Sequence, residues 1–578
     1  MRWRIGVLVL VGLFVATSAV LGGELLRRNL GTEPPTADPA LSTDTTSVEI
    51  VENMFLGLVD LDEVDMSPVP ELATSWTASD DGLTWTFFMR DDVYWVKYDP
   101  KAGKVGYARD AYGSPRPVTA YDVEYGVKRT LDPRTASDYA YVLYIIKGGM
   151  DLNEADPADP GFQALLDGVG VKALNATTVQ FTIEAPAGYF VQIASMWVAR
   201  PMPQWAIEAH GDLWTEPDNI VTNGPYAMKE WVHNDHMVFV KNPYIPAPLW
   251  GGGNIDQVYC TMVVEASTEF SMYQAGELDT GGVPLPEMDR VKADPVLSKE
   301  LVIRPFPCTY YYGFVTTKPP MDNPDVRKAL SMTIDRKTLV EQVTKGGQIP
   351  ANTFAPGMIF GNAALDPQIA PWAIGAAGWD YDKAVTEAQK LLAKAGYPDG
   401  AGLEIILMHN VSEGHARIAQ AIQSMWAKAF PKARFIIETQ EWGVYLKTIE
   451  KTTPIANVPH VYRLGWCQDY PDQNNWVYEV WNSNMSNRAR LSINDPNVGA
   501  AIAKFDDLTA RAGRESDPVV RKDLYFEAER LLVEEIVGLA PIYYYTQIVL
   551  NKPWLTRRWH DTPHWDTWLI DGALRGKI

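Results

Sequence analysis

The segment from Arg463 to Tyr470, with the sequence RLGWCQDY, combines charged, aromatic and small residues that could bind a charged ligand. The carboxylate of Asp469 can pair with an ammonium group, and a hydrogen bond to a charged group contributes roughly 1.5 to 3 kcal/mol. The guanidinium of Arg463 can bind a carboxylate through two parallel hydrogen bonds. An extended ligand could also pair as an added strand with the backbone N–H and C=O groups of Gly465, Trp466 and Cys467.

Each of these side chains also has an ordinary structural interpretation. The run Asp469-Tyr470-Pro471-Asp472 is common turn composition. Arg463 could pair with a structural acid, and a lone aromatic residue usually belongs to the core. The elements around the segment must therefore decide between a site and a turn.

The length and charge of the chain limit its class. A chain of 578 residues is too long for one hydrophobic core and should divide into two or three domains. The 51 basic and 72 acidic residues give a net charge of -21, which disfavours binding to nucleic acid or to anionic lipid. The 20 Trp and 27 Tyr exceed what a core usually needs, so some rings are expected in a binding site.

The N-terminus has the outline of a secretory signal. Two arginines, in Met1-Arg2-Trp3-Arg4, precede an apolar run from Ile5 to about Leu21. We expect residues 1–28 to be a signal peptide, with an uncleaved N-terminal anchor as the alternative. No cysteine follows the run to accept a lipid, which favours a freely diffusing periplasmic protein.

Three cysteines occur in the chain: Cys260, Cys308 and Cys467. An exported protein reaches a compartment where disulfides persist, so one pair and one free thiol are expected. Spacing alone does not identify the pair.

Strand-like and helix-like segments alternate irregularly, which predicts an α/β protein with more than one sheet. We expect an α-β-α-β unit between Asp382 and Thr439, with a partly parallel sheet. Other helices are expected to begin at Thr119, Asn323, Asp335, Asn497 and Pro518. Strands are expected at 83–90, 177–183 and 548–551, followed by an irregular aromatic tail.

Motifs typical of enzymes are missing from the sequence. It contains no Gly-x-Ser-x-Gly, no phosphate-binding Gly-x4-Gly-Lys-Ser/Thr and no His-Glu-x-x-His. Two histidine pairs have spacings that could bind a metal, but no cysteine or carboxylate group accompanies them; they are His233 with His236 and His560 with His564. We therefore expect a protein that is not an enzyme and has no cofactor or metal.

Nearly all of the chain after residue 28 resembles the extracellular solute-binding family of ABC importers, and within it the oligopeptide- and dipeptide-binding type. The resemblance rests on short segments in a fixed order. They are Pro68-Val69-Pro70-Glu71-Leu72-Ala73, Asp81-Gly82-Leu83-Thr84-Trp85, Pro117-Val118-Thr119-Ala120-Tyr121-Asp122, Asn223-Gly224-Pro225-Tyr226, Tyr273-Gln274-Ala275-Gly276-Glu277-Leu278-Asp279, Asp325-Val326-Arg327-Lys328-Ala329-Leu330, Gly465-Trp466-Cys467 and Asn551-Lys552-Pro553-Trp554-Leu555.

The resemblance implies a periplasmic-binding-protein-like α/β fold, with two lobes joined by a hinge and a third, smaller subdomain. The lobes would be discontinuous in sequence. Lobe I would comprise residues 29–55, 182–306 and 541–578, the small subdomain 56–181, and lobe II 307–540.

The resemblance also implies roles for particular residues. Asp469 would hold a peptide's ammonium group, Arg463 the carboxylate of short peptides, and Cys308 would form a disulfide with Cys467, which leaves Cys260 as a buried apolar residue. The expected pocket walls are Trp442, Trp466 and Tyr139, with a contact from the opposite lobe at Asp44 and Thr45. Two positions depart from the family pattern: Gly313 replaces an acidic pocket residue, and Ile449 replaces an arginine that reaches longer peptides.

The function implied is that of the periplasmic binding component of an ABC importer. Such a monomer would capture oligopeptides by their backbone and termini between the lobes and deliver them to a membrane permease. The alternative is the same fold binding another solute, such as an oligosaccharide, a metal chelate or haem.

Overall fold

The computed structural model describes residues 23–62, 65–376, 378–559 and 562–576. The apolar run of the expected signal lies outside the described residues. Residues 24–28, which the sequence assigns to that signal, instead belong to strand β1 (Glu24–Asn29), which pairs in parallel with β12 (Ile255–Thr261). The folded part of the chain therefore begins before residue 29.

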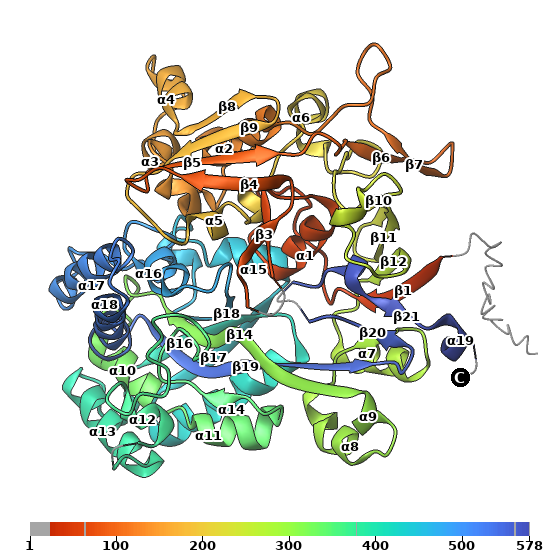
Figure 1. The fold of residues 1–578 in the computed structure, drawn as a ribbon. Coiled ribbons are helices and arrows are strands. Elements are labelled where there is room, and N and C mark those ends of the chain that lie inside the picture. Colours follow the sequence, from red (N-terminus) through yellow and green to blue (C-terminus); the bar gives the residue numbers. More distant parts are fainter. Residues whose placement is uncertain (1–22, 63–64, 377, 560–561, 577–578) are drawn as a thin grey trace, which may run out of the picture.

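Three larger sheets organise the described chain (Figure 1). Sheet I has the order β1-β12-β11-β10, where β11 is His236–Lys241 and β10 is Tyr226–Val232. Sheet III, at the top of the view, has the order β4-β5-β9-β8. Its strands are Ala73–Ala78, Thr84–Met89, Thr178–Thr182 and Val171–Asn175.

Sheet II lies across the lower half of Figure 1 and contains seven strands. Its main path is β13-β19-β14-β18-β16-β17, and β15 (Ile349–Pro350) also pairs with β19. The strands of the path are β13 (Thr280–Gly281), β19 (Leu539–Asn551), β14 (Leu301–Phe314), β18 (Val461–Cys467), β16 (Glu404–Asn410) and β17 (Arg434–Gln440).

Two long antiparallel strands, β14 and β19, run through the centre of sheet II. Only residues 548–551 of β19 were predicted as strand, and β14 was not predicted. The lobe boundaries expected at 306/307 and 540/541 fall inside these two strands, so the chain passes between the expected lobes without a loop. The domain boundaries themselves stay a prediction.

Most helices predicted from capping signals are present. Helix α10 (Pro324–Met332) has Asn323 as its N-cap, with the Asn323 side chain accepting a hydrogen bond from the N–H of Asp325, and Pro324 in the first turn. Helix α2 (Ala120–Leu131) follows Thr119, whose N–H donates to the Asp122 carboxylate at 2.7 Å. The sequence therefore indicates these helix starts correctly.

The predicted α-β-α-β unit is confirmed. It comprises α13 (Tyr381–Lys394), β16, α14 (Glu413–Ala429) and β17, and β16 pairs in parallel with β17 from Glu404–Arg434 to Asn410–Gln440. Helices α17 (Gly499–Ala512) and α18 (Pro518–Arg530) follow. The tail, predicted as irregular, also contains β20 (Leu555–Thr556), β21 (Leu569–Ile570) and α19 (Gly572–Arg575).

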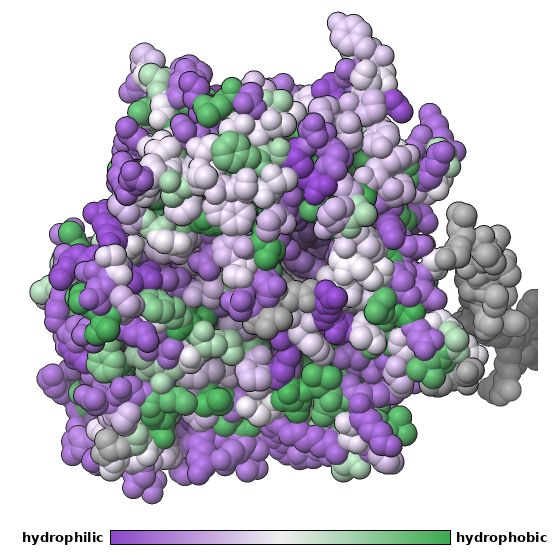
Figure 2. Space-filling view, in the orientation of Figure 1, coloured by the Kyte–Doolittle hydropathy of each residue, from purple (hydrophilic) through white to green (hydrophobic). Residues whose placement is uncertain are grey.

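The core divides into several apolar clusters, as expected for a chain of this length. One lies beneath the α-β-α-β unit and contains Leu392, Leu407 and Trp426. The free thiol of Cys260 is buried in the largest cluster, which agrees with its prediction as an apolar residue. The outer face in Figure 2 is mainly hydrophilic, with apolar residues in small scattered groups.

Within the described ranges, no helix is both long and apolar enough to cross a membrane.

Candidate ligand-binding site

A cavity of about 520 Å³ lies where sheet II, helix α1 (Thr45–Met54) and the C-terminal segment meet. Every predicted ligand-binding residue lines it: Asp44, Thr45, Tyr139, Trp442, Arg463, Gly465, Trp466, Cys467 and Asp469. These residues come from widely separated parts of the sequence. The fold thus brings the whole predicted set around one space, although their binding role remains a prediction.

Strand β18 presents an open backbone edge to this cavity. It pairs antiparallel with β14 over its whole length, but with β16 only at Val461 and Tyr462. The N–H of Gln468 donates to the carbonyl of Pro307 at 3.0 Å. This hydrogen bond identifies the residues of β18 whose backbone groups bond to β14. Because these residues alternate along an antiparallel ladder, the backbone groups of Gly465 and Cys467 point away from β14.

Trp466 therefore contributes its ring to the site, since its backbone belongs to the residues that face β14. The indole stacks on the ring of Tyr139 with the centroids 6.3 Å apart and the planes 9° from parallel. Tyr139 directly precedes the 3₁₀ helix Ala140–Ile145, between α2 and sheet III's last strands in sequence. An aromatic wall thus spans two parts of the molecule.

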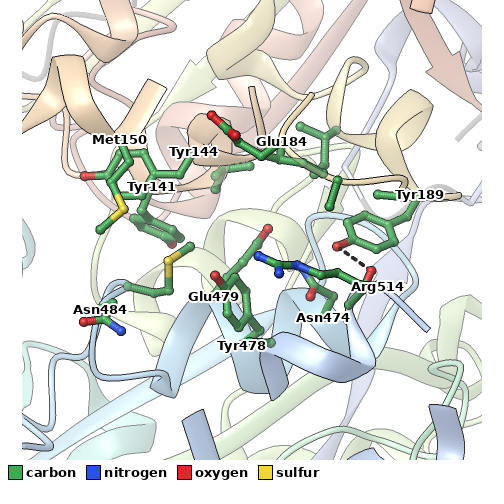
Figure 3. Close-up of a pocket in the computed structure, with 18 of the residues that line it drawn as sticks. Tyr141, Tyr144, Met150, Glu184, Tyr189, Asn474, Tyr478, Glu479, Asn484 and Arg514 are labelled. Carbon is green, nitrogen blue, oxygen red and sulfur yellow. Dashed lines mark hydrogen bonds between the residues drawn. The ribbon is translucent and has the colours of Figure 1, made fainter. Parts of the chain in front are cut away.

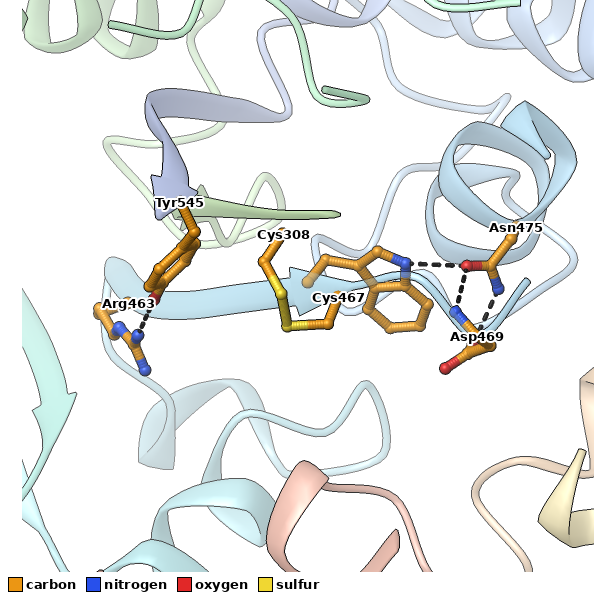
Figure 4. Close-up of a disulfide and its surroundings, with 7 residues drawn as sticks. Cys308, Arg463, Cys467, Asp469, Asn475 and Tyr545 are labelled. Carbon is orange, nitrogen blue, oxygen red and sulfur yellow. Dashed lines mark hydrogen bonds between the residues drawn. A yellow bond between two sulfur atoms is a disulfide. The ribbon is translucent and has the colours of Figure 1, made fainter. Parts of the chain in front are cut away.

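Asp469 follows β18 and faces the cavity (Figure 4). Its Oδ2 accepts a hydrogen bond from Asn475 Nδ2 at 2.8 Å. The desolvation caused by the surrounding protein raises the pKa of Asp469 to about 7, and the Asn475 hydrogen bond opposes this shift. Among the described residues no cation forms an ion pair with this carboxylate, so the site holds an acid whose countercharge must come from elsewhere.

Asn475 is a residue that the sequence analysis missed. Its Oδ1 accepts hydrogen bonds from the backbone N–H of Asp469 at 3.0 Å and from Trp466 Nε1 at 3.3 Å. Its Nδ2 donates both to Asp469 and to the buried carboxylate of Glu479 at 2.8 Å. Asn475 therefore fixes the positions of the acid and of the aromatic wall together. No motif marks it in the sequence.

Arg463 lies at the other end of β18 (Figure 4). Its guanidinium donates to Tyr545 Oη at 2.6 Å and to Asn410 Oδ1 at 3.3 Å, and its Cζ lies 4.5 Å from the centroid of the Tyr310 ring. No acid of the described chain forms an ion pair with it. Among the described residues, therefore, no structural acid pairs with Arg463. Its side chain contacts Tyr545, Asn410 and Tyr310 instead.

Trp442 and Asp44 connect two sides of the cavity. Trp442 begins α15 (Trp442–Thr448), after β17, and its Nε1 donates to Asp44 Oδ1 at 3.2 Å. The same oxygen caps helix α1 by accepting from the N–H groups of Thr46 and Ser47. The other oxygen, Oδ2, is buried without a hydrogen bond, and burial raises the pKa of Asp44. Asp44 is both a helix cap and a cavity residue.

A disulfide joins Cys308 and Cys467, as the resemblance implied (Figure 4). The two cysteines are directly opposite each other in the β14–β18 ladder. The bond therefore crosslinks the strand that carries the open edge to the centre of sheet II.

The two departures from the family pattern have clear surroundings. A Cβ on Gly313 would lie 2.1 Å from the Tyr462 ring, so that ring occupies the space of any larger side chain. Ile449 is a buried apolar residue at the end of α15. Neither position supplies a charge to the cavity.

A second cavity of about 440 Å³ contains none of the predicted residues (Figure 3). Tyr141 and Tyr189 line it from one side and Tyr478, Glu479 and Arg514 from the other. Tyr141 also lines the first cavity. Because the open strand edge and Asp469 lie in the first cavity, that cavity is the better candidate.

The first histidine pair, His233 with His236, is not part of a metal-binding group within the described residues. In the described ranges, no group of three or more His, Cys, Asp or Glu side chains is arranged to hold a metal ion. His233 contacts Glu33 at 2.8 Å and His236 contacts Asp235 at 2.7 Å. His560 lies outside the described residues, so the spacing of His560 with His564 is not tested.

Comparison with known proteins identifies relatives over nearly the whole chain. The family model "Bacterial extracellular solute-binding proteins, family 5 Middle" matches residues 67–488. The periplasmic oligopeptide-binding protein OppA of Escherichia coli K12 is 31% identical over 537 residues, which cover 92% of this chain and 89% of the relative. The crystal structure of Haemophilus influenzae OppA in complex with the peptide RPPGFSPFR is 26% identical, with a TM-score of 0.80, and the match covers 95% of this chain and 99% of that one.

Two structures of the murein tripeptide-binding protein MppA also match, and this chain is more similar to one of them than to the other. The Escherichia coli structure has a TM-score of 0.81 at 29% identity, covering 95% of this chain and 99% of that one. The unliganded open form has a TM-score of only 0.61 at 30% identity, covering 95% and 98%. The present structure differs from the open form and, like its relatives, has a periplasmic-binding-protein-like α/β fold of several domains. The chain belongs to family 5 of the bacterial extracellular solute-binding proteins.

Proposed function

We propose that this protein is the peptide-binding component of an ABC importer. It captures oligopeptides in the cavity beside β18 and releases them to a membrane permease. Family membership and the peptide complex of a relative support this function. The protein acts by binding alone, without covalent chemistry, as a periplasmic monomer divided into two lobes and a small subdomain at the boundaries predicted above, except that lobe I begins with β1 at Glu24.

One observation carries the proposal: next to an unpaired strand edge lies Asp469, an acid that has no ion-pair partner among the described residues. Desolvation of Asp469 costs free energy that a ligand ammonium would recover. Gly465 and Cys467 offer the backbone groups that an extended chain can bind by strand addition. Asp469 would bind the N-terminus of a peptide, and the strand edge would bind its main chain. Neither interaction depends on the side chains of the ligand.

Another solute fits the cavity less well. A sugar offers neutral hydroxyl groups, which would leave the charge of Asp469 without a counterion. A metal chelate or haem would give no reason for the open backbone edge. The cavity therefore favours a ligand that is cationic at one end and extended beyond it.

The testing experiment is native mass spectrometry of protein purified from the periplasm without denaturation. We expect a series of bound masses that fragment as peptides. A single bound non-peptide mass would contradict the proposal.

The Asp469→Asn variant sharpens this test, because it keeps the shape of the side chain and removes its charge. We expect this variant to lose the bound peptides, corresponding to about 1.5 to 3 kcal/mol of binding free energy. Asp472→Asn is not a suitable control, since Asp472 pairs with Arg521. Asp507→Asn is the matched control and should retain the peptides, because Asp507 is exposed on α17 and its ion pair with Arg511 is a surface one, which contributes little.

A further inference from the structure

The cavity contains a second charged region, formed by sheet I and the C-terminal segment. Four charged side chains line it there: Arg28, Glu49, Glu269 and Arg557. Arg28 forms an ion pair with Glu49, and Glu49 also accepts a hydrogen bond from Trp565 Nε1 at 3.1 Å. Glu269 accepts a hydrogen bond from the N–H of Gly282 at 3.0 Å. Three of the four groups therefore have partners within the protein.

Arg557 is the exception. Its Nε is buried without a hydrogen bond, and no acid of the described chain forms an ion pair with it. Two indole rings pack against the guanidinium, with Cζ 4.4 Å from the Trp559 centroid and 4.2 Å from the Trp568 centroid. Such rings stabilise the cation through its faces and leave the N–H donors at its edge available.

Other buried guanidinium groups in the chain are treated differently. Arg327 donates to the carbonyls of Met321, Ile536 and Val537, and Arg336 to those of Ser331, Ile334 and Pro541. Arg521 forms two hydrogen bonds with Asp472. Arg28, Arg200 and Arg463 also have a buried Nε without a hydrogen bond. Each of them is held through another nitrogen, by Glu49, Glu52 and Tyr545 respectively. Each of these guanidinium groups therefore has at least one polar partner among the described residues, as expected from the cost of leaving its donors unpaired.

The surroundings of Arg557 also repel a positive charge. Burial, together with the nearby charges of Arg28 and Arg304, lowers the pKa of Arg557 to about 9. An anion placed beside Arg557 would reverse this effect, because an opposite charge favours the ionised form. The missing partner is therefore anionic, and the lining of the cavity places it in the ligand space.

We infer that Arg557 forms a subsite for a carboxylate of the bound ligand, supplied either by the C-terminus of the peptide or by an acidic side chain. The inference rests on the proposed peptide-binding function and adds a preference to it. Asp469 and Arg557 lie in one cavity but do not interact, so each can bind a different group of the same ligand. Arg463 is a separate cation, already held by Tyr545 and Asn410.

The test compares the purified, ligand-stripped protein with its Arg557→Gln variant by isothermal titration calorimetry. The ligands are alanine peptides of increasing length, all with a free N-terminus. The first arm compares each peptide that has a free C-terminus with its amidated form. In the second arm every peptide is amidated, and a peptide with one internal alanine replaced by Glu is compared with the same peptide carrying Gln. The arms distinguish a terminal carboxylate from an acidic side chain.

The wild-type protein should prefer the carboxylate over its neutral counterpart in at least one arm. In Arg557→Gln we expect the affinity for that peptide to fall roughly ten- to hundred-fold, while the neutral counterpart changes less than about two-fold. Arg557→Lys should retain part of the preference. Arg558→Gln is the matched control, because the neighbouring Arg558 is exposed, and it should behave like the wild type.

Two results would overturn the subsite. One is a wild-type protein that binds acidic and neutral peptides equally at every length. The other is an Arg557→Gln variant that loses the same factor for both, which would indicate that the side chain only supports Trp559 and Trp568. In either case binding of the neutral peptides would still support the proposed function, whereas failure of every peptide to bind the wild type would remove both.

Discussion

The Asp469 carboxylate determines how binding should depend on pH. Desolvation raises its pKa to about 7, so the acid is partly protonated in the ligand-free closed form at neutral pH. A peptide ammonium pairs with the ionised form, and the α-amino group itself deprotonates near pH 7.7 to 8.0. In that form the two titrations oppose each other across a narrow range of pH.

Because the free protein is expected to be open, with Asp469 in contact with water, we predict that peptide affinity falls as the pH drops toward the ordinary carboxyl pKa near 3.9, and that it also falls above about pH 8, where the α-amino group loses its proton. Below that carboxyl pKa, affinity should fall about ten-fold per pH unit, because binding requires the ionised acid. Calorimetry over the pH range in which the protein stays folded measures this profile. Asp469→Asn should bind weakly with no acidic limb; an acidic limb that persists in this variant would assign the titration to another group.

The same shift has a consequence for stability. The pKa of Asp469 is higher in the closed form than in the unfolded chain, where a carboxyl of this type titrates near 3.9. The ligand-free closed form therefore loses free energy of unfolding as the pH rises from about 4 to about 7, and the loss remains at higher pH. Opening removes the same cost, so ionisation of Asp469 favours the open form over the closed one. Ligand-free Asp469→Asn should therefore be more compact than the wild type at pH 8 and similar to it at pH 4, as measured by small-angle X-ray scattering.

At the scale of elements, β18 gives the site its extended edge, and the disulfide fixes that edge to β14. Cys308 and Cys467 are 159 residues apart in sequence, so their bond closes a long loop. In the chain-entropy model, crosslinking such a loop restricts the unfolded chain and stabilises the native state.

We predict that the double variant Cys308→Ala/Cys467→Ala loses about 2 to 4 kcal/mol of the free energy of unfolding. Urea unfolding under oxidising conditions measures this loss. Peptide affinity should also fall, because the open edge at Gly465 and Cys467 is less firmly held. Cys260→Ala provides a control for removal of a cysteine outside the crosslink, and equal stability of the double variant and the wild type would contradict the prediction.

The elements that the sequence missed have identifiable causes. Strand β14 contains Pro305 and Pro307, and a proline within a run argues against a strand because it cannot donate to the ladder. The structure accommodates the prolines by shifting the register between Pro305 and Thr309. Pro541 in β19 falls at the second shift, opposite Tyr311. Helices with N-caps, such as α10, were predictable because their signals are local.

At the scale of the whole molecule, closure without a ligand leaves charges unsatisfied. The structure is closed in the sense that Trp442 contacts Asp44 and Trp466 stacks on Tyr139 across the cavity. The same closure desolvates Asp469 and leaves Asp44 Oδ2 and Arg557 Nε without hydrogen bonds to any described residue. A ligand that satisfies these groups would favour the closed form, whereas water can satisfy them in an open one.

We predict that the ligand-free protein is open in solution and that a bound peptide lowers its radius of gyration. Small-angle X-ray scattering with and without peptide measures the change. Trp442→Phe removes the hydrogen bond to Asp44 across the cavity together with part of the ring, and should reduce affinity by at least about 0.5 to 1.5 kcal/mol. An unchanged radius of gyration in the presence of a peptide shown to bind would exclude hinge closure.

The sequence by itself determined the fold class, the capped helices, the α-β-α-β unit and, through the resemblance, a set of residues that all line one cavity. These depend on local patterns or on short motifs. The tertiary structure alone decided which backbone groups of β18 face the cavity, that Asn475 holds Asp469 and Trp466, and that Arg557 Nε is buried without an acceptor among the described residues. Such features depend on strand register and on desolvation by residues hundreds of positions away, and no local pattern records them.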